Sequence, residues 1–213
     1  MDKFPSDIQQ QVEMGISILK GGGLVAFPTD TVYGLGACAT MLEAVERVYM
    51  VKERPRSMAL PLLLAHTSQI SEVASPVSQV AWRLAHSFLP GALTIVLPRS
   101  GSIPDIITAG GVTVAIRVPA HSIPVALIEG LGVPIVGTSA NLSGKPNLLS
   151  AGDVCSQFGD KIDLVIDGGQ CLGGRESTVV DVSGETPMLL REGAISREEL
   201  EQVCGSIVCM VGV

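Results

Sequence analysis

The hydrophobic positions of this chain recur with helical spacing in some segments and form short, continuous apolar runs in others. Near the N-terminus, Ile8, Val12 and Leu19 fall on one face of a helix. Ser6 is positioned to cap this helix, and the glycines at 21–23 would end it. The same patterns predict helices over Met41–Met50, Ser75–Phe88, Pro124–Glu129 and Asp153–Phe158, and strands over Leu24–Phe27, Leu60–Leu64, Leu93–Leu97, Val112–Val118, Pro134–Val136, Leu164–Ile166, Thr178–Val182 and Met188–Leu190.

Helix and strand patterns alternate in the first part of the chain, whereas strands dominate towards the end. We therefore predict an α/β fold in which a twisted mixed sheet is flanked by helices. Ser196, followed three residues later by Glu199, has the spacing of a capping box for a last helix. No linker, internal repeat or low-complexity segment divides the sequence, so we expect a single domain over residues 1–213.

The composition restricts the possible classes of function. Hydrophobic residues make up 46% of the chain, aromatic residues make up only 3%, and the formal net charge is −7. So few aromatic side chains do not build a surface on which bases stack. The negative charge also argues against a protein whose main task is to bind nucleic acid.

Cysteine and histidine spacing gives no sign of a disulfide framework or a metal site. The five cysteines include no C-x-x-C pair, and the three histidines share no metal-ligand spacing, so we expect reduced thiols and no bound zinc. The N-terminal sequence lacks the pattern of a signal peptide, and no apolar run reaches the roughly 18 residues of a membrane span. These features predict a cytoplasmic protein that does not contact membranes.

A polar segment over Pro28–Gly36 directly follows the first predicted strand. It places two threonines, an aspartate and a tyrosine beyond the carboxyl end of a strand, where α/β sheets bind ligands. Gly34, Gly36 and Ala39 also match the dinucleotide-binding pattern G-x-G-x-x-A, but they do not follow the strand directly. The region about 20 residues further on holds basic residues instead of the acidic residue that contacts ribose, so we do not expect NAD binding.

Two pairs of polar residues share a two-residue spacing. Lys52 and Arg54 precede a proline, and in an extended segment both side chains would project to one side, where two cations suit a polyphosphate. On this reading the pair lies on a ligand-facing loop and outside the core. Ser139 and Asn141 follow a predicted strand, and their hydroxyl and amide groups can bind phosphate, ribose or carboxylate. Taken alone, the Lys52–Arg54 pair is better explained as a solvated basic turn.

Further polar residues lie on predicted strands or next to them. Thr113 and Arg117 share one face of a strand because their spacing is even, and Arg191 follows a short apolar strand. A single arginine at a strand end is often a surface charge, whereas several cations around one pocket would suit an anionic ligand. The sequence contains no Walker loop and no nucleophile elbow, so we expect neither a P-loop nor serine–histidine catalysis.

Taken in order, these segments resemble the YrdC-type threonylcarbamoyl-adenylate synthases. The resemblance covers roughly residues 21–203 and corresponds to the short, single-domain form of that family. Its specificity comes from the ordered set of motifs and not from any one of them. The matching pieces are PTDTVYGLG at 28–36, Lys52-x-Arg54-Pro55, PGALT at 90–94, VAIRVP at 114–119, Ser139-Ala140-Asn141, Glu176-Ser177-Thr178 and LREG at 190–193.

The resemblance implies a fold, a reaction and a set of site residues. The fold is a twisted α/β sheet around a large concave cavity. The reaction joins L-threonine, bicarbonate and ATP into L-threonylcarbamoyl-AMP, releases pyrophosphate and supplies the machinery that makes t6A in tRNA. Mg²⁺ would bind through the ATP phosphates, without an organic cofactor. By this resemblance the catalytic residues are Lys52, Arg54, Ser139 and Asn141, the ATP-binding residues are these four with Thr113, Asn147 and Arg191, and the threonine-binding residues are Thr31, Arg117 and Ser177.

Two alternatives stay open at this point. One is a double-stranded RNA-binding module, although the acidic charge favours neither this reading nor direct contact with tRNA. The other is the domain of a carbamoyltransferase that forms a carbamoyl-adenylate without threonine, although those enzymes carry acylphosphatase and zinc-finger regions that we do not find in this sequence. The chain also departs from the family at Met58-Ala59-Leu60, where Asn or Lys before Pro-Leu is common.

Overall fold

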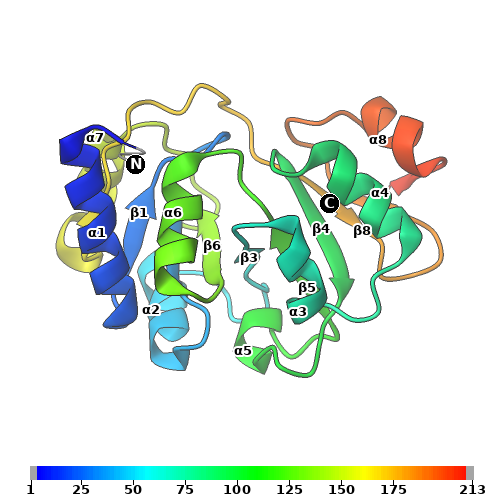
Figure 1. Cartoon of the computed structure of the whole chain (residues 1–213), viewed down its shortest axis with the longest axis horizontal. Coiled ribbons are helices and arrows are strands. Elements are labelled where there is room, and N and C mark those ends of the chain that lie inside the picture. The colour runs from blue at the N-terminus through cyan, green and yellow to red at the C-terminus, as the bar shows by residue number, and fades with distance from the viewer. Residues whose placement is uncertain (1–3, 210–213) are drawn as a thin grey trace.

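The computed structural model describes residues 4–209, which build one open sheet with helices packed against it (Figure 1). The strands are β1 Val25–Phe27, β2 Gly34–Cys38, β3 Leu62–Leu63, β4 Leu93–Pro98, β5 Thr113–Arg117, β6 Ile135–Ser139, β7 Leu164–Val165, β8 Thr178–Asp181, β9 Met188–Arg191 and β10 Val208–Cys209. Their order in the ten-stranded sheet is β10-β9-β8-β4-β5-β3-β6-β2-β1-β7. The sheet contains both parallel pairs, such as β4 with β8, and antiparallel pairs, such as β4 with β5. This mixed sheet confirms the predicted fold class.

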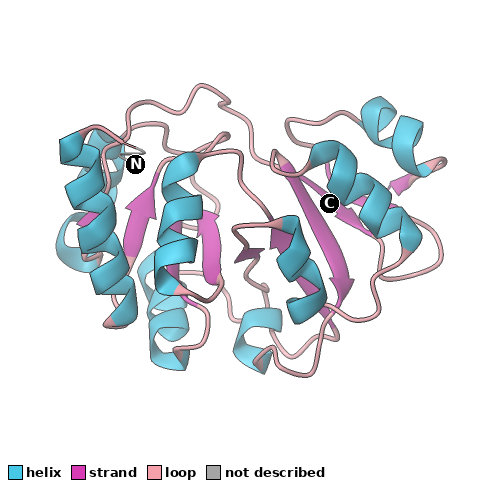
Figure 2. Ribbon diagram, viewed as in Figure 1, coloured by secondary structure: helices cyan, strands magenta, loops and turns pink. Residues whose placement is uncertain are grey.

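The longer helices follow the predicted hydrophobic stripes with shifted boundaries, whereas the short helices over Ile70–Val73 and Asp105–Thr108 were not predicted (Figure 2). A capping box opens the last helix as predicted: the Ser196 hydroxyl accepts a hydrogen bond from the Glu199 amide, and the Glu199 carboxylate accepts one from the Ser196 amide. The α-helices are α1 Ser6–Lys20, α2 Leu42–Lys52, α3 Ile70–Val73, α4 Gln79–Phe88, α5 Asp105–Thr108, α6 Ser122–Leu131, α7 Ala151–Phe158 and α8 Arg197–Cys204, and the 3₁₀ turns are η1 Thr67–Gln69 and η2 Gly159–Lys161.

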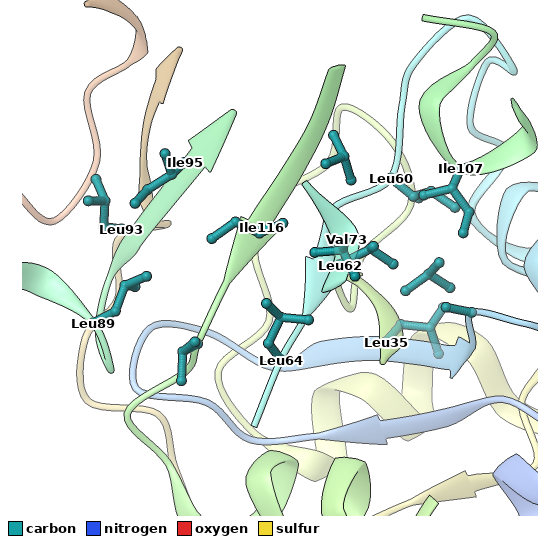
Figure 3. Packing of buried hydrophobic residues seen from close by; sticks show 14 of the residues in the cluster. Leu35, Leu60, Leu62, Leu64, Val73, Leu89, Leu93, Ile95, Ile107 and Ile116 are labelled. Atoms are coloured by element: carbon teal, nitrogen blue, oxygen red, sulfur yellow. The ribbon is translucent and has the colours of Figure 1, made fainter. Parts of the chain in front are cut away.

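Two hydrophobic cores form on opposite faces of the sheet, because neighbouring side chains of a strand point to opposite sides. Leu62 of β3 packs into the larger core with residues of α2, α3, α4, α5, α7 and α8, part of which Figure 3 shows. Its neighbour Leu63 packs into the smaller core with α1 and α6. Each buried Leu, Ile or Val side chain stabilises the fold by roughly 1.5–3 kcal/mol. Leu63 also lines a cavity together with Thr94, Ala115 and Val179 of β4, β5 and β8. The cavity therefore lies on the same face of the sheet as the smaller core.

Two of the predicted helix starts are wrong. The chain around Ser75 is extended, since its amide donates to the Pro98 carbonyl, and Pro76 disfavours helical backbone in the residue before it. Helix α4 therefore begins only after Ser78, whose hydroxyl accepts a hydrogen bond from the backbone amide three residues later. Ser6 is itself the first residue of α1 and does not cap it with its side chain.

The glycine-rich segment that matches the dinucleotide pattern is strand β2, which the sequence analysis missed. It lies between β1 and β6, and all five of its residues are buried. A Cβ atom on Gly36 would come within 2.5 Å of the Ile135 side chain and 3.0 Å of the Phe27 ring. The glycine is therefore required for close packing within the sheet, and its low intrinsic strand preference concealed the strand.

Candidate active site

A cavity of about 890 Å³ lies over β4, β5 and β8, beside the loop that joins β1 to β2. All of the predicted site residues except Thr113 line it, which confirms the expected concave cavity. Thr113 begins β5, four residues before Arg117, and the rise of a strand separates the two by about 13 Å. The structure does not bring Thr113 into the cavity wall.

Cations dominate the charged residues of the wall. Such a cluster suits a polyanionic ligand better than isolated surface charges do. Among the described residues that line the cavity, the charged ones are Lys52, Arg54, Arg117, Lys145 and Arg191 on the positive side and Glu176 on the negative side.

Arg117 is a buried cation in a fixed position at one end of the cavity. Its guanidinium donates to the Asp30 carboxylate at 2.7 Å, the Thr31 hydroxyl at 3.0 Å and the Gly91 carbonyl at 3.0 Å. Burial lowers the pKa of Arg117 and the Asp30 carboxylate raises it, so the group stays charged. These contacts use three of its five N–H groups and leave two for a ligand. Such a preorganised fork suits a carboxylate.

The loop that presents Thr31 is shaped by the Thr29 hydroxyl. This hydroxyl donates to the Val32 carbonyl at 2.6 Å and accepts from the Thr31 amide at 3.1 Å. Thr29 and Thr31 are both buried, and their hydroxyls lie 3.0 Å apart. The β1–β2 loop therefore holds the Thr31 hydroxyl in one position beside Arg117.

Ser177 lines the same cavity and directly precedes β8. Its hydroxyl is 2.8 Å from that of Thr94, and its carbonyl accepts from the Arg191 guanidinium at 2.9 Å. Arg191 also forms an ion pair with Glu176. The Ser177 hydroxyl is thereby placed within the same cavity as Arg117, as the family resemblance implied.

Gly193 allows this arrangement because a side chain there would collide with the backbone of the site. A Cβ atom would lie 2.2 Å from the Glu176 carbonyl oxygen and 2.5 Å from the Ser177 carbonyl carbon. We expect Gly193→Ala to lower the free energy of unfolding by about 1–3 kcal/mol, the usual cost of overpacking. Chemical denaturation measures it, with Gly184→Ala, whose Cβ would meet open space, as the control. Equal stability of the two variants would contradict the close approach.

Lys52 is not on a loop, and the prediction that it extends alongside Arg54 is wrong. Helix α2 continues to Lys52, and Glu53 ends it in the left-handed region with φ 52°. The Lys52 side chain is only 1% exposed, and its ammonium donates to the carbonyls of Ser139 and Asn141, each at 2.5 Å. Burial, and then the Arg54 guanidinium, lower the pKa of Lys52 to about 7 against the opposing effect of Glu176. The buried Lys52 side chain therefore connects the end of α2 to the backbone of Ser139 and Asn141 through hydrogen bonds.

Ser139 and Asn141 form a linked pair at the end of β6, which continues further than predicted. The Ser139 hydroxyl donates to the Asn141 side-chain carbonyl at 2.6 Å. The Asn141 amide group in turn donates to the Lys145 carbonyl at 2.5 Å. The strand, the lysine behind it and the following loop thus fix a polar corner of the cavity.

Arg54 faces this corner from the segment that departs from the family pattern. Its guanidinium donates to the backbone carbonyls of Met58 at 3.1 Å and Ala59 at 2.8 Å. Because these contacts use backbone atoms, they do not depend on the side chains at 58 and 59. Three N–H groups of Arg54 remain for a ligand.

Some polar residues lie outside the cavity, and others that line it were not predicted from the sequence. His66 is at the surface, 3.1 Å from Glu129, and does not line the cavity. Glu176, Thr94 and Lys145 do line it. Glu176 and Thr94 belong to motifs of the sequence that gave neither residue a role. Nothing in the sequence pointed to Lys145 apart from its place near Asn147.

The described part of the chain contains no group of three or more His, Cys, Asp or Glu side chains placed to hold a metal ion. Within residues 4–209, none of the helices combines the length and hydrophobicity that a bilayer crossing requires.

The model of the Sua5/YciO/YrdC family, which is described as "Telomere recombination", matches residues 17–193. A threonylcarbamoyl-AMP synthase from Pyrococcus abyssi is 45% identical over 92% of this chain and 58% of its own length. The chain thus spans less than two thirds of that curated relative.

Comparison with solved structures agrees with the family match. The fold is similar to P. abyssi Sua5 complexed with L-threonine, with a TM-score of 0.91 and 44% identity over 93% of this chain and 58% of that one. It is also similar to Escherichia coli YciO, with a TM-score of 0.83 and 29% identity over 90% of this chain and 93% of that one. The family match, the identities and the shared fold agree, and the chain belongs to the Sua5/YciO/YrdC family.

Proposed function

We propose that this chain is a nucleotidyltransferase that forms L-threonylcarbamoyl-AMP from L-threonine, bicarbonate and ATP. One observation carries the proposal: a single cavity holds a fixed, buried arginine beside the Thr31 hydroxyl and, in the same wall, further cations together with the Ser139–Asn141 pair. The first suits an amino acid and the second a polyphosphate. The names of the relatives, and the L-threonine bound to P. abyssi Sua5, support the same assignment.

At the amino-acid end, the two free N–H groups of Arg117 would bind the threonine carboxylate, with the hydroxyls of Thr31 and Ser177 beside it. The neutral amine of threonine would attack the carbon of bicarbonate with loss of water, or of CO₂ with loss of a proton, to form a carbamate. A carbamate oxygen would then attack the α-phosphate, and pyrophosphate would leave. This sequence needs no nucleophile from the enzyme; it needs the reactants aligned within one enclosure, which can supply several kcal/mol of the barrier.

At the nucleotide end, Arg54 and Arg191 would bind the phosphates, with Ser139, Asn141 and Asn147 in the wall. Guanidinium groups already held by protein acceptors do not reorganise when negative charge develops in the transition state. Mg²⁺ would arrive with ATP, bound through phosphate oxygens and water.

The five cysteines are free thiols, which fits a reducing compartment, and we propose that the enzyme acts in the cytoplasm. Its product is an activated acyl group that the machinery for t6A modification of tRNA would consume. Neither alternative function is favoured by a particular feature of the cavity.

The decisive assay is release of pyrophosphate from ATP with each substrate omitted in turn. We expect release only when L-threonine, bicarbonate and Mg·ATP are all present. Threonine-independent release with bicarbonate would instead support a carbamoyl-adenylate-forming enzyme. Binding of double-stranded RNA with a steep dependence on salt, without any turnover, would support the RNA-binding alternative.

Serine is expected to be a poorer substrate than threonine. The missing methyl group removes a contact worth roughly 1–3 kcal/mol, so kcat/KM should fall by about 10- to 200-fold. Steady-state pyrophosphate release with the two amino acids measures the ratio. Equal activity with serine and with unrelated amino acids would contradict a threonine site.

A further inference from the structure

Four of the five cations in the cavity wall are held by acceptors of the protein itself. Lys52, Arg54 and Arg117 donate to backbone carbonyls, and Arg191 donates to Glu176 and Ser177. Lys145 differs, because its ammonium group makes no hydrogen bond or ion pair with any residue that the structure describes, and the residue is exposed. Among the described residues of this wall, Lys145 therefore carries the positive charge that is not already bound by the protein.

The backbone at Lys145 is nevertheless fixed. Its carbonyl accepts from the Asn141 side chain at 2.5 Å, and its amide donates to the Leu142 carbonyl at 3.0 Å. Gly144, just before it, has a φ of +76°, which favours glycine and makes the turn possible. The lysine side chain therefore starts from a defined point beside the Ser139–Asn141 pair, while its end is free to move.

Ser143 supplies a second, independent observation. This residue also lines the cavity, and its hydroxyl is buried without a hydrogen-bond partner among the described residues. Its amide donates to the Lys52 carbonyl at 2.9 Å, which fixes the backbone while the side chain can still rotate. A buried hydroxyl without a partner is unfavourable, and residues 4–209 provide no acceptor for it.

We propose that Ser143 and Lys145 bind the terminal phosphates of ATP and, after the reaction, the pyrophosphate that leaves. This inference rests on the proposed function, because it assumes that the cavity takes ATP. The fixed guanidinium groups of Arg117, Arg54 and Arg191 suit the reacting end of the substrates, which must be aligned. A solvated lysine binds a polyphosphate as a mobile point charge and releases it readily, as a leaving group requires.

The test is calorimetric measurement of Kd for inorganic pyrophosphate, ATP and AMP, each with Mg²⁺, on the full chain. Lys145→Gln is expected to weaken binding of pyrophosphate and ATP by about two- to fivefold, the effect of one exposed charge pair, and to leave AMP binding nearly unchanged. Lys145→Arg should retain most of the affinity, and Ser143→Ala should weaken pyrophosphate binding as well. Lys161→Gln, an exposed lysine outside the cavity, is the matched control.

Unchanged pyrophosphate binding in Lys145→Gln, or an equal loss for AMP, would overturn the assignment. Thermal unfolding of this variant should match the wild type, since the side chain has no partner within residues 4–209. A wild-type protein that binds pyrophosphate through Lys145 but shows no threonine-dependent turnover would contradict the proposed function and leave this site standing. A wild-type protein that binds neither pyrophosphate nor ATP would contradict both.

Discussion

Replacing Arg117 with glutamine is expected to lower kcat/KM for L-threonine by about 10²- to 10⁴-fold. The two N–H groups that Arg117 leaves free would each make a charge-assisted bond to the substrate carboxylate, worth about 1.5–3 kcal/mol, and the variant loses both. Arg117→Lys should recover only part of the loss, because an ammonium group does not reproduce the planar fork. Steady-state kinetics with varied threonine at saturating ATP measures the effect.

Asp30 provides the control for this experiment. In Arg117→Gln the half-buried Asp30 carboxylate loses its ion-pair partner and keeps only the Ala120 amide, which destabilises the fold in addition to any effect on binding. The double variant Asp30→Asn/Arg117→Gln removes that unpaired charge and should regain stability without regaining activity. In both variants Kd for ATP should stay within about threefold of the wild type. A normal KM for threonine in a folded Arg117→Gln variant would show that the carboxylate binds elsewhere.

Replacing Lys52 with methionine is expected to lower the free energy of unfolding by about 2–6 kcal/mol, because the Ser139 and Asn141 carbonyls each lose a hydrogen bond from Lys52 that costs about 1–3 kcal/mol. For a chain of this size the melting temperature should fall by roughly 4–24 °C. Differential scanning calorimetry measures the shift. Turnover should also fall, because Ser139 and Asn141 lose the group that holds their backbone.

Lys161→Met is the matched control, since Lys161 is exposed and outside the cavity, and its stability should stay within about 0.5 kcal/mol of the wild type. A Lys52→Met variant that melts like the wild type but has lost ATP binding would restore the original reading of Lys52 as a solvent-facing phosphate ligand.

Lys52 illustrates what the sequence can and cannot predict. The K-x-R pattern identified two residues that belong to the site, but their spacing was read with the period of a strand. The helix that ends at Lys52 turns that side chain into the core, and only the left-handed residue Glu53 lets Arg54 face the cavity. The conformation of one linking residue, which sequence patterns do not report, separates the two readings.

The large elements were predictable because their apolar periodicity is strong, as for α1 and α6. Strand β2 was not predictable, since its glycines are required by close contact with the Ile135 and Phe27 side chains of neighbouring strands. The low intrinsic strand preference of glycine does not reveal this contact. The cavity itself depends on contacts across the whole chain. Arg117 meets Asp30 across 87 positions of sequence, and no local pattern contains that pairing. The family resemblance indicated Arg117 and Thr31 as site residues but not the pairing with Asp30, and it included Thr113, which does not line the cavity.

The most direct test of the account is the identity of the product formed from ¹³C-labelled bicarbonate, L-threonine and Mg·ATP. High-resolution mass spectrometry of the quenched reaction should show one compound that contains AMP, threonine and a single labelled carbon, formed in equal amount to the pyrophosphate released. Its formation should depend on all three substrates and fail in Arg117→Gln. An adenylate that lacks threonine or the labelled carbon, or pyrophosphate released without any such adenylate, would contradict the proposed function.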